Sequence, residues 1–124
     1  MTFREVLSKV VDSTPGARAA VVMGTDGIPV EEYRAEATGT DLDLPTMAVD
    51  FQRVLEEAQK VTMQMGSDSG GPLEEVILKT GRIQVLFRPI DEEYYLIVAL
   101  ERTGFMGKAR YLVSSLLQDL REEL

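Results

Sequence analysis

The sequence predicts a single α+β domain, an α/β sandwich in which helices cover both faces of one five-stranded antiparallel sheet. Segments with helical periodicity lie at the two ends and near the middle of the 124-residue chain, and short apolar runs lie between them. Short loops and the absence of a βαβ crossover argue against a doubly wound sheet. No linker or internal repeat divides residues 1–124, and this length suits one core. We expect the order α-β-β-α-β-β-β-α, with the middle helix on one face and the outer helices on the other.

The first helix is predicted over residues 3–13. Thr2 and Glu5 have the spacing of a capping box, which satisfies two backbone N–H groups at a helix start. Pro15 and Gly16 then end the segment. The apolar residues that recur at helical spacing are Phe3, Val6, Leu7, Val10 and Val11.

A β-hairpin is predicted to follow. Residues 17–23 form an apolar run rich in Ala and Val, and a second run begins at Ile28 and includes Val30 and Tyr33. The segment between the two runs, Gly24-Thr25-Asp26-Gly27, has turn-forming residues at both ends. Residues 35–44 mix Gly, Thr and acidic residues, so we expect a loop there.

The longest periodic segment covers residues 45–65 and predicts the middle helix. Asp43 is a suitable N-cap, Pro45 is tolerated in the first turn, and Gly66 lies where a helix should stop. At 100° per residue, one narrow apolar stripe forms, and we expect it to face the core. Its members are Met47, Phe51, Val54, Ala58, Val61 and Met65.

Three strands and a helix complete the predicted fold. The strands cover residues 73–78, 83–88 and 94–100, with turns at Thr80-Gly81 and over residues 89–93. The third strand is almost entirely apolar, which is typical of a central strand buried on both faces. After a connection over residues 104–107, the last helix has one apolar face. That face consists of Ala109, Leu112, Val113, Leu116, Leu117, Leu120 and Leu124.

Composition excludes several classes of function. With 13 basic and 21 acidic residues, the net charge is −8, which disfavours nucleic-acid and membrane partners. The chain has no Cys and no His, so disulfides and thiolate metal sites are excluded and the commonest general base is missing. The first residues lack the pattern of a signal peptide, and the longest apolar stretch, residues 96–100, is too short to span a bilayer. We therefore expect a cytoplasmic protein.

No motif for catalysis or cofactor binding is present. Around Gly107-Lys108, a P-loop would need Gly at the position of Arg102 and Ser or Thr at the position of Ala109. The Ser residues have no His base. Asp41 and Asp43 supply too few oxygens for calcium. We therefore expect neither an enzyme nor a bound cofactor or metal.

Three segments resemble the roadblock family, which is named after dynein light chains and has a profilin-like fold. They are a first hairpin over residues 25–30, a middle hairpin over residues 76–85, and a small-residue entry into the last helix over residues 104–112. The chain looks most similar to the bacterial MglB-like members. The resemblance implies a homodimer in which the middle strands of two copies join one sheet and the second helices lie side by side. It also implies binding to a small Ras-like GTPase and, in the MglB type, stimulation of GTP hydrolysis.

Two other functions stay open: a scaffold or adaptor dimer with no effect on hydrolysis, and a small-molecule sensor. A sensor needs an apolar pocket with a few converging polar groups. The catalytic arginine of the GTPase reaction is expected to come from the GTPase, so the chain would have no catalytic residue of its own. Arg102, Lys108 and Arg110 could supply an arginine finger, but solubilising charge at a helix end is the interpretation we favour.

The middle helix carries an uncharged flank, which is typical of interface cores. We assign the dimer interface to this flank and to the predicted strand over residues 73–78, which would expose unpaired backbone groups if it lies at the edge of the sheet. The alternatives are an ordinary surface with Leu55 in the core, and an interior strand. The predicted dimer interface consists of Ala48, Leu55, Thr62, Val76, Ile77 and Leu78, and the predicted partner surface of Val49, Gln52, Arg53, Glu56, Gln59 and Met63.

Overall fold

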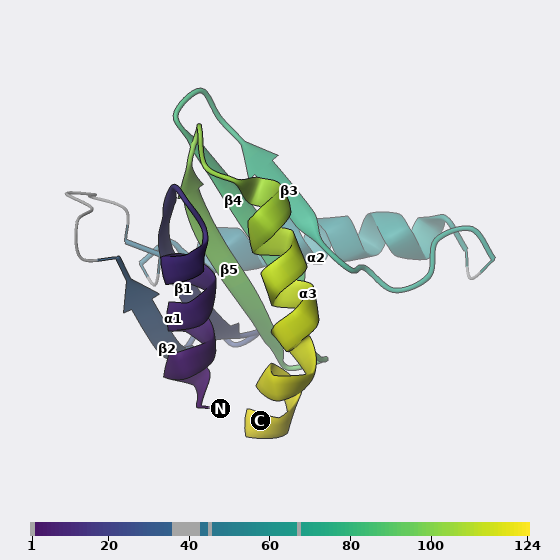
Figure 1. Cartoon of the computed structure of the whole chain (residues 1–124). Helices are drawn as coiled ribbons and strands as arrows, with labels where there is room; N and C mark the ends of the chain where they lie inside the picture. The colour runs from purple at the N-terminus through teal and green to yellow at the C-terminus, as the bar shows by residue number, and fades with distance from the viewer. Residues whose placement is uncertain (1, 36–42, 45, 67) are drawn as a thin grey trace.

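The computed structural model of the chain describes residues 2–35, 43–44, 46–66 and 68–124. Its elements form one five-stranded antiparallel sheet with helices on both faces, which confirms the predicted fold class (Figure 1). None of the helices in these ranges is both long and apolar enough to cross a membrane. In chain order the elements are α1 (Phe3–Ser13), β1 (Ala17–Gly24), β2 (Pro29–Arg34), α2 (Ala48–Gln64), β3 (Val76–Lys79), β4 (Ile83–Pro89), β5 (Tyr94–Glu101) and α3 (Met106–Glu123).

The strand order across the sheet is β2-β1-β5-β4-β3. The central strand is β5, and its residues 95–100 are buried, as the apolar run predicts. The two ends of the sheet are β2 and β3, so β3 has a neighbouring strand on one side only, β4. Of the two alternatives for this segment, an edge strand and an interior strand, the structure shows the edge strand, which begins at Val76 rather than at residue 73.

Helices α1 and α3 cover one face of the sheet, as predicted. Thr2 and Glu5 form the expected capping box at the start of α1. The apolar face of α3 is covered over most of its length, with Leu112 partly buried and Leu124 exposed at the end. The buried residues of the two helices are Val6, Leu7, Val10, Val11, Ala109, Val113, Leu116, Leu117 and Leu120.

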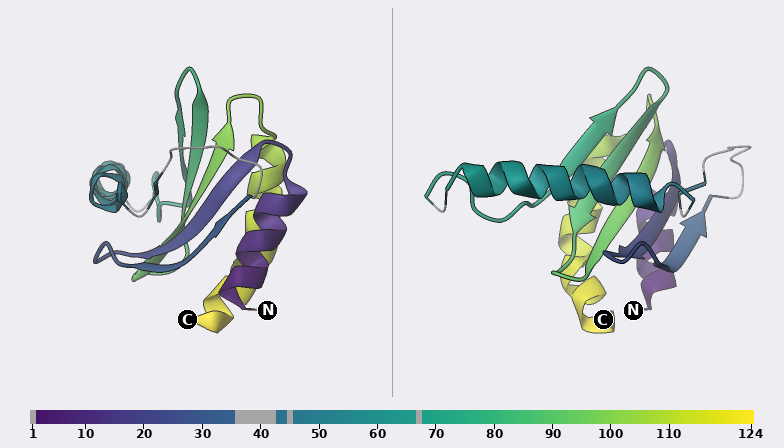
Figure 2. Two further views of the ribbon diagram at one scale, coloured as in Figure 1. Left: turned by 90° about the vertical axis from the view of Figure 1, so that its left-hand side faces the viewer. Right: turned by 180° about the vertical axis from the view of Figure 1, so that it is seen from behind.

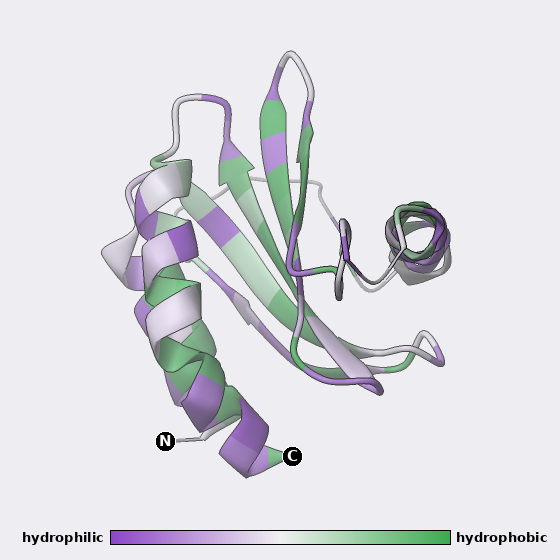
Figure 3. Ribbon diagram, turned by 90° about the vertical axis from the view of Figure 1, so that its right-hand side faces the viewer, coloured by the Kyte–Doolittle hydropathy of each residue, from purple (hydrophilic) through white to green (hydrophobic). Residues whose placement is uncertain are grey.

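Among the described elements, α2 is the one helix on the opposite face. Figure 3 shows α2 almost end-on on one side of the sheet and α3 on the other. Phe51 packs edge-to-face on Phe87 of β4, with ring centroids 5.1 Å apart, and Leu55 is 2% exposed. The second half of α2 continues past the β3 edge of the sheet (Figure 2). The chain returns to the sheet after Gly66, whose positive φ of 80° suits a helix stop at glycine.

The predicted buried stripe of α2 is mostly wrong. Phe51 is buried and Ala58 is partly buried, but Met47, Val54, Val61 and Met65 are exposed. The reason is that the helix presents Phe51 and Leu55 to the sheet and extends beyond it, so the described residues leave one side of its apolar arc uncovered.

The start of α2 also differs from the prediction. The helix begins at Ala48, with Met47 at the N-cap and no side-chain cap. Asp43 instead accepts hydrogen bonds from the hydroxyl and the N–H of Thr46, at 2.6 and 3.3 Å, in the preceding turn. The Thr46 hydroxyl holds the pKa of Asp43 below its ordinary value. Most of the loop predicted over residues 35–44 lies outside the described residues.

Candidate functional site

The β3 edge of the sheet exposes apolar side chains on both of its faces. Leu78 lies on the α2 side because it pairs with Val85, and Ile77 lies on the α1/α3 side because it pairs with Leu86. They are 42% and 40% exposed, while Val76 packs partly against the α2-side core. An apolar edge strand without a neighbour is a surface that proteins normally cover or block.

Helix α2 exposes a second apolar surface, which we call the α2 stripe and define as Met47, Val54, Val61 and Met65. Val61 is 50% exposed, and Met63 beside the stripe is 78% exposed. Charged residues follow on the neighbouring side of the helix, where Asp50 and Arg53 form a pair at 3.8 Å. These i,i+3 charges mark the solvated face of α2, so the stripe lies between that face and the core.

The α2 stripe and the β3 edge belong to the same end of the sheet. Figures 1 and 2 both show α2 running across the sheet and beyond β3. A helix that extends past its own sheet leaves apolar surface that the rest of the described chain does not cover. The two features therefore form one candidate surface for self-association, in which a second sheet edge would lie beneath the projecting half of α2.

The predicted interface residues of α2 are placed differently. Leu55 is in the core, so its assignment to an exposed flank is wrong, because the sheet meets the helix on this side. Thr62 is partly buried, and its hydroxyl donates to the carbonyl of Gln59 at 2.7 Å. Ala48 lies in the first turn of α2, and the structure does not describe its side chain.

Most of the predicted partner-binding residues are accessible. Arg53, Glu56, Gln59 and Met63 are exposed, and the partly buried Gln52 donates to the Glu56 carboxylate at 3.1 Å. The side chain of the sixth, Val49, lies outside the described atoms. These residues span several sides of α2 rather than one face, since the helix turns by 100° per residue.

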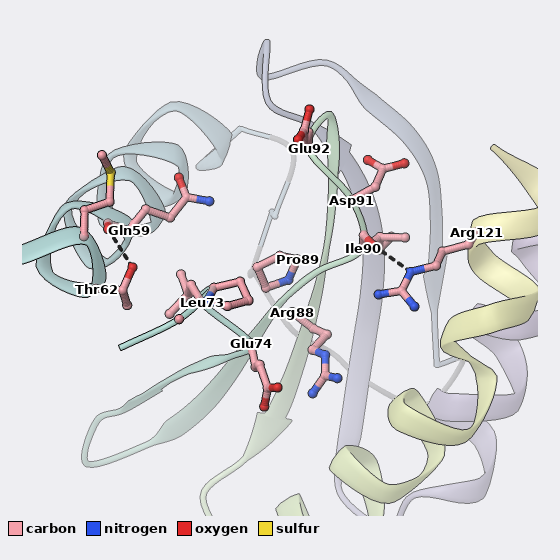
Figure 4. A pocket seen from close by; sticks show the side chains of 13 residues that line it. Gln59, Thr62, Leu73, Glu74, Arg88, Pro89, Ile90, Asp91, Glu92 and Arg121 are labelled. Carbon is pink, nitrogen blue, oxygen red and sulfur yellow. Dashed lines mark hydrogen bonds between the residues drawn. The ribbon is translucent and has the colours of Figure 1, made fainter. Parts of the chain in front are cut away.

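An open cleft of about 660 Å³ lies between α2, the segment before β3, the β4–β5 turn and α3. Figure 4 shows Leu73 and Pro89 between two charged ends, with Asp91 and Glu92 at one end and Glu74 and Arg88 at the other. The Arg121 side chain donates to the Ile90 carbonyl at 3.0 Å. The sequence contained no signal for this cleft, because its walls come from four separate segments.

Charged side chains of the described residues form ion pairs rather than a metal site. They include no cluster of three or more acidic side chains that could hold a metal ion. Of the three cations near the start of α3, Arg110 forms an ion pair with Glu75, which raises the pKa of Arg110. Glu75 also pairs with Arg88 at 3.7 Å. These pairs join α3 and β4 to the segment before β3, and the residues that they connect are too distant in sequence for the contacts to be predicted.

Comparisons with known proteins support the resemblance. No protein-family model matches the chain, and no curated protein sequence matches it. Among solved structures, MglC from Myxococcus xanthus is 29% identical over 100% of both chains, with a TM-score of 0.69. The gliding protein MglB from Thermus thermophilus is 19% identical over 96% of this chain and 85% of that one, with a TM-score of 0.84.

A roadblock domain from Streptomyces avermitilis is 16% identical over 98% of this chain and 97% of that one, with a TM-score of 0.81. The last two similarities concern the fold, since their identities are low, whereas MglC is also similar in sequence. The strand order, the helix layers and these likenesses confirm the resemblance inferred from the sequence: the chain has the roadblock-type fold and is similar to MglB and MglC.

Proposed function

We propose that the chain is a non-catalytic, homodimeric regulator that binds a small Ras-like GTPase and modulates its GTP hydrolysis. The observation that carries the proposal is the uncovered β3 edge beside the projecting, apolar half of α2. A second copy that pairs its β3 with this β3 would cover Ile77 and Leu78. The same arrangement would bring the two α2 stripes together.

The regulatory part of the proposal rests on similarity. A gliding protein, MglB, shares the fold over 96% of this chain, and MglC is 29% identical. The sequence contains no P-loop motif, so in this proposal the partner binds the nucleotide. The exposed polar residues of α2, including Arg53, Glu56 and Gln59, are the surface that we assign to the GTPase.

The dimer is tested by two arginines on the α2 stripe. Val54→Arg with Val61→Arg should give folded monomers, because two charges would face each other across an apolar contact. The matched control is Ile28→Arg with Val30→Arg, which adds the same charges to exposed apolar positions near the opposite edge of the sheet. Sedimentation velocity measures the outcome. If the stripe variant remains a dimer, or the control also dissociates, the interface lies elsewhere.

The partner is tested by a pull-down from host lysate, with GDP or a non-hydrolysable GTP analogue added. A regulator that senses the nucleotide state should retain a small GTPase with one nucleotide and not with the other, since a ligand must distinguish two states to bias them. Hydrolysis assays with the recovered GTPase then measure the change in rate. Equal retention in both states would support the scaffold function, with no effect on hydrolysis.

The cleft in Figure 4 favours a sensor as the second candidate. Its volume of about 660 Å³ falls in the range of small-molecule sites, and its lining combines Leu73 and Ile90 with Arg121 and Asp91. A sensor should gain thermal stability from a small molecule in a ligand screen, and Leu73→Trp, at a partly buried position of the cleft wall, should abolish that gain. A pull-down that recovers no GTPase, together with such a gain, would replace the regulator with the sensor.

A further inference from the structure

One end of this acidic molecule is basic. Four exposed cations lie around the β3–β4 turn and the β5–α3 connection: Lys79, Arg82, Arg102 and Lys108. We call this surface the basic end. The whole chain has a net charge of −8, so the rest of it carries −8 − 4 = −12. Such a separation of charge creates a local field opposite in sign to that of the molecule.

The cations of the basic end have no acidic partner among the described residues. Each of the seven ion pairs found there, at N–O distances of up to 4.0 Å, involves other basic residues. Glu101, which lies opposite Ile83 where β4 pairs with β5, forms an ion pair with Arg18 at 3.5 Å. The first turn of α3 carries no acidic residue either. The positive charge is therefore available to a ligand.

The backbone under the basic end is held firmly. Gln84 is buried and donates from its amide to the carbonyls of Glu101, Arg102 and Gly104, at 3.1 to 3.2 Å. Gly16 packs so closely that a Cβ there would clash with the Cα of Gly104. These contacts fix the β4 start against the β5–α3 connection. A surface that is already ordered loses less entropy on binding.

An exposed aromatic side chain, Phe105, lies between Arg102 and Lys108 in the sequence. Phe105 follows the connection directly and is 59% exposed, and its N–H donates to the Pro15 carbonyl at 3.0 Å. Of the eight Phe and Tyr residues, the other exposed one is Tyr111, one and a half turns along α3. Exposed aromatic and Arg side chains are the residues enriched at the energetic centres of protein interfaces.

We propose that the basic end binds an acidic segment of a partner protein, with Phe105 as the apolar anchor. Lys79 is the last residue of β3 and borders the proposed dimer edge, whereas Arg82, Arg102 and Lys108 lie outside the α2 and β3 surfaces assigned above. The inference rests on these three cations and Phe105 and does not depend on the dimer. Charge complementarity favours a short acidic segment over a nucleic acid or a lipid surface. An extended polyanion would also approach the remaining −12 charge and be repelled, whereas a segment confined to the basic end would not.

The test measures binding of a short fluorescein-labelled peptide of Glu and Asp with one central Leu, by fluorescence anisotropy. We expect saturable binding that weakens with added NaCl, because exposed charges are screened. Arg82→Glu with Lys108→Glu should weaken binding about tenfold, since two attractions become repulsions. The matched control, Lys9→Glu with Lys60→Glu, makes the same charge change on α1 and α2 and should bind like the original chain.

A second pair of variants tests the anchor. Phe105→Ser should weaken binding of the Leu-containing peptide, while Ile28→Ser, at another exposed apolar position, should not. Thermal unfolding and sedimentation of every variant establish that fold and assembly are kept. The proposal is overturned if the peptide fails to bind, or if both charge variants weaken binding equally. It is also overturned if phosphatidylglycerol vesicles or single-stranded DNA bind the basic end and the peptide does not.

Discussion

Helices α2 and α3 have nearly the same length, yet they use their apolar residues differently. In α3, five residues on one face are buried between the sheet and α1: Ala109, Val113, Leu116, Leu117 and Leu120. In α2, the buried hydrophobic residues among those described are Phe51 and Leu55, and four apolar residues of the α2 stripe are exposed. The same kind of periodicity thus leads to a covered helix on one face of the sheet and an uncovered one on the other.

The difference teaches that an apolar arc in the sequence of a helix shows which side chains need to be buried. It does not show whether the sheet, another helix or a second protein chain buries them. The face opposite α2 holds two helices that pack on each other and on the sheet. In the part of the chain that the structure describes, the α2 face holds one helix, which runs past the sheet edge (Figure 2). A second copy of the chain is the partner that we propose for the uncovered part of α2 and for β3.

The sharpest test of this comparison uses two neighbouring residues of α2. Leu55→Arg should lower the free energy of unfolding by at least about 4 kcal/mol, because it places an unpaired charge in the core. Val54→Arg should change it by about 0.5 kcal/mol or less in the monomer, because this side chain is already exposed. Urea unfolding followed by circular dichroism, at low protein concentration, gives both values. Equal losses would mean that α2 is rotated from its place in the structure.

The contribution of α2 to the core is tested by Phe51→Ala. We expect a loss of about 3–5 kcal/mol in the free energy of unfolding, the usual range for a buried aromatic truncation. The ring contact with Phe87 at 5.1 Å would be lost as well. Met63→Ala, at an exposed position of the same helix, is the control. A loss below about 1 kcal/mol for Phe51→Ala would contradict the packing of α2 on the sheet.

The core beneath α2 also contains a titratable group. Burial raises the pKa of Tyr95 from 10.0 to about 12, and its hydroxyl has no hydrogen-bond partner among the described residues. The unfolded chain releases the Tyr95 hydroxyl proton at a lower pH than the folded chain does. The contribution of the protonated Tyr95 to the free energy of unfolding is therefore fully present below pH 10.0 and is lost as the pH rises towards about 12.

Stability should therefore fall by up to about 1.4 kcal/mol per pH unit in this window. Tyr95→Phe should remove that dependence, while Tyr111→Phe, at an exposed position, should keep it. At neutral pH, Tyr95→Phe should be neutral or slightly stabilising, since the lost hydroxyl is unpaired. Urea unfolding across the alkaline range measures these effects. An unchanged slope in Tyr95→Phe would show that another group causes the loss.

The smallest expected effect concerns the starts of the helices. Thr2 caps α1 with a full capping box, whereas α2 begins at Met47 without a side-chain cap. Thr2→Ala should cost about 1 kcal/mol, and Thr2→Ser should cost less because the hydroxyl is kept. Thermal unfolding measures both. An Ala variant as stable as the Ser variant would mean that the box contributes nothing to α1.

Much of the local structure could be predicted from the sequence. The bounds of α1 and the central position of β5 follow from capping residues, apolar runs and turns, whereas local signals left both an edge and an interior position open for β3. The candidate site was predicted less well. Ile77 and Leu78 are exposed at the edge as expected, but Leu55 lies in the core. The pairing of Glu75 with Arg88 and Arg110 and the cleft before β3 had no local signal, because each joins separate segments.

The sequence by itself determined the order of elements, the absence of Cys and His, and the width of the apolar arc on α2. Only the tertiary structure decided which part of that arc meets the sheet. Periodicity fixes the angles between side chains on one helix, but the rotation of the helix is set by residues elsewhere, here Phe87 and its neighbours in the sheet. The same reason applies to the basic end, where four cations from three segments meet because Gln84 ties a strand to a distant turn.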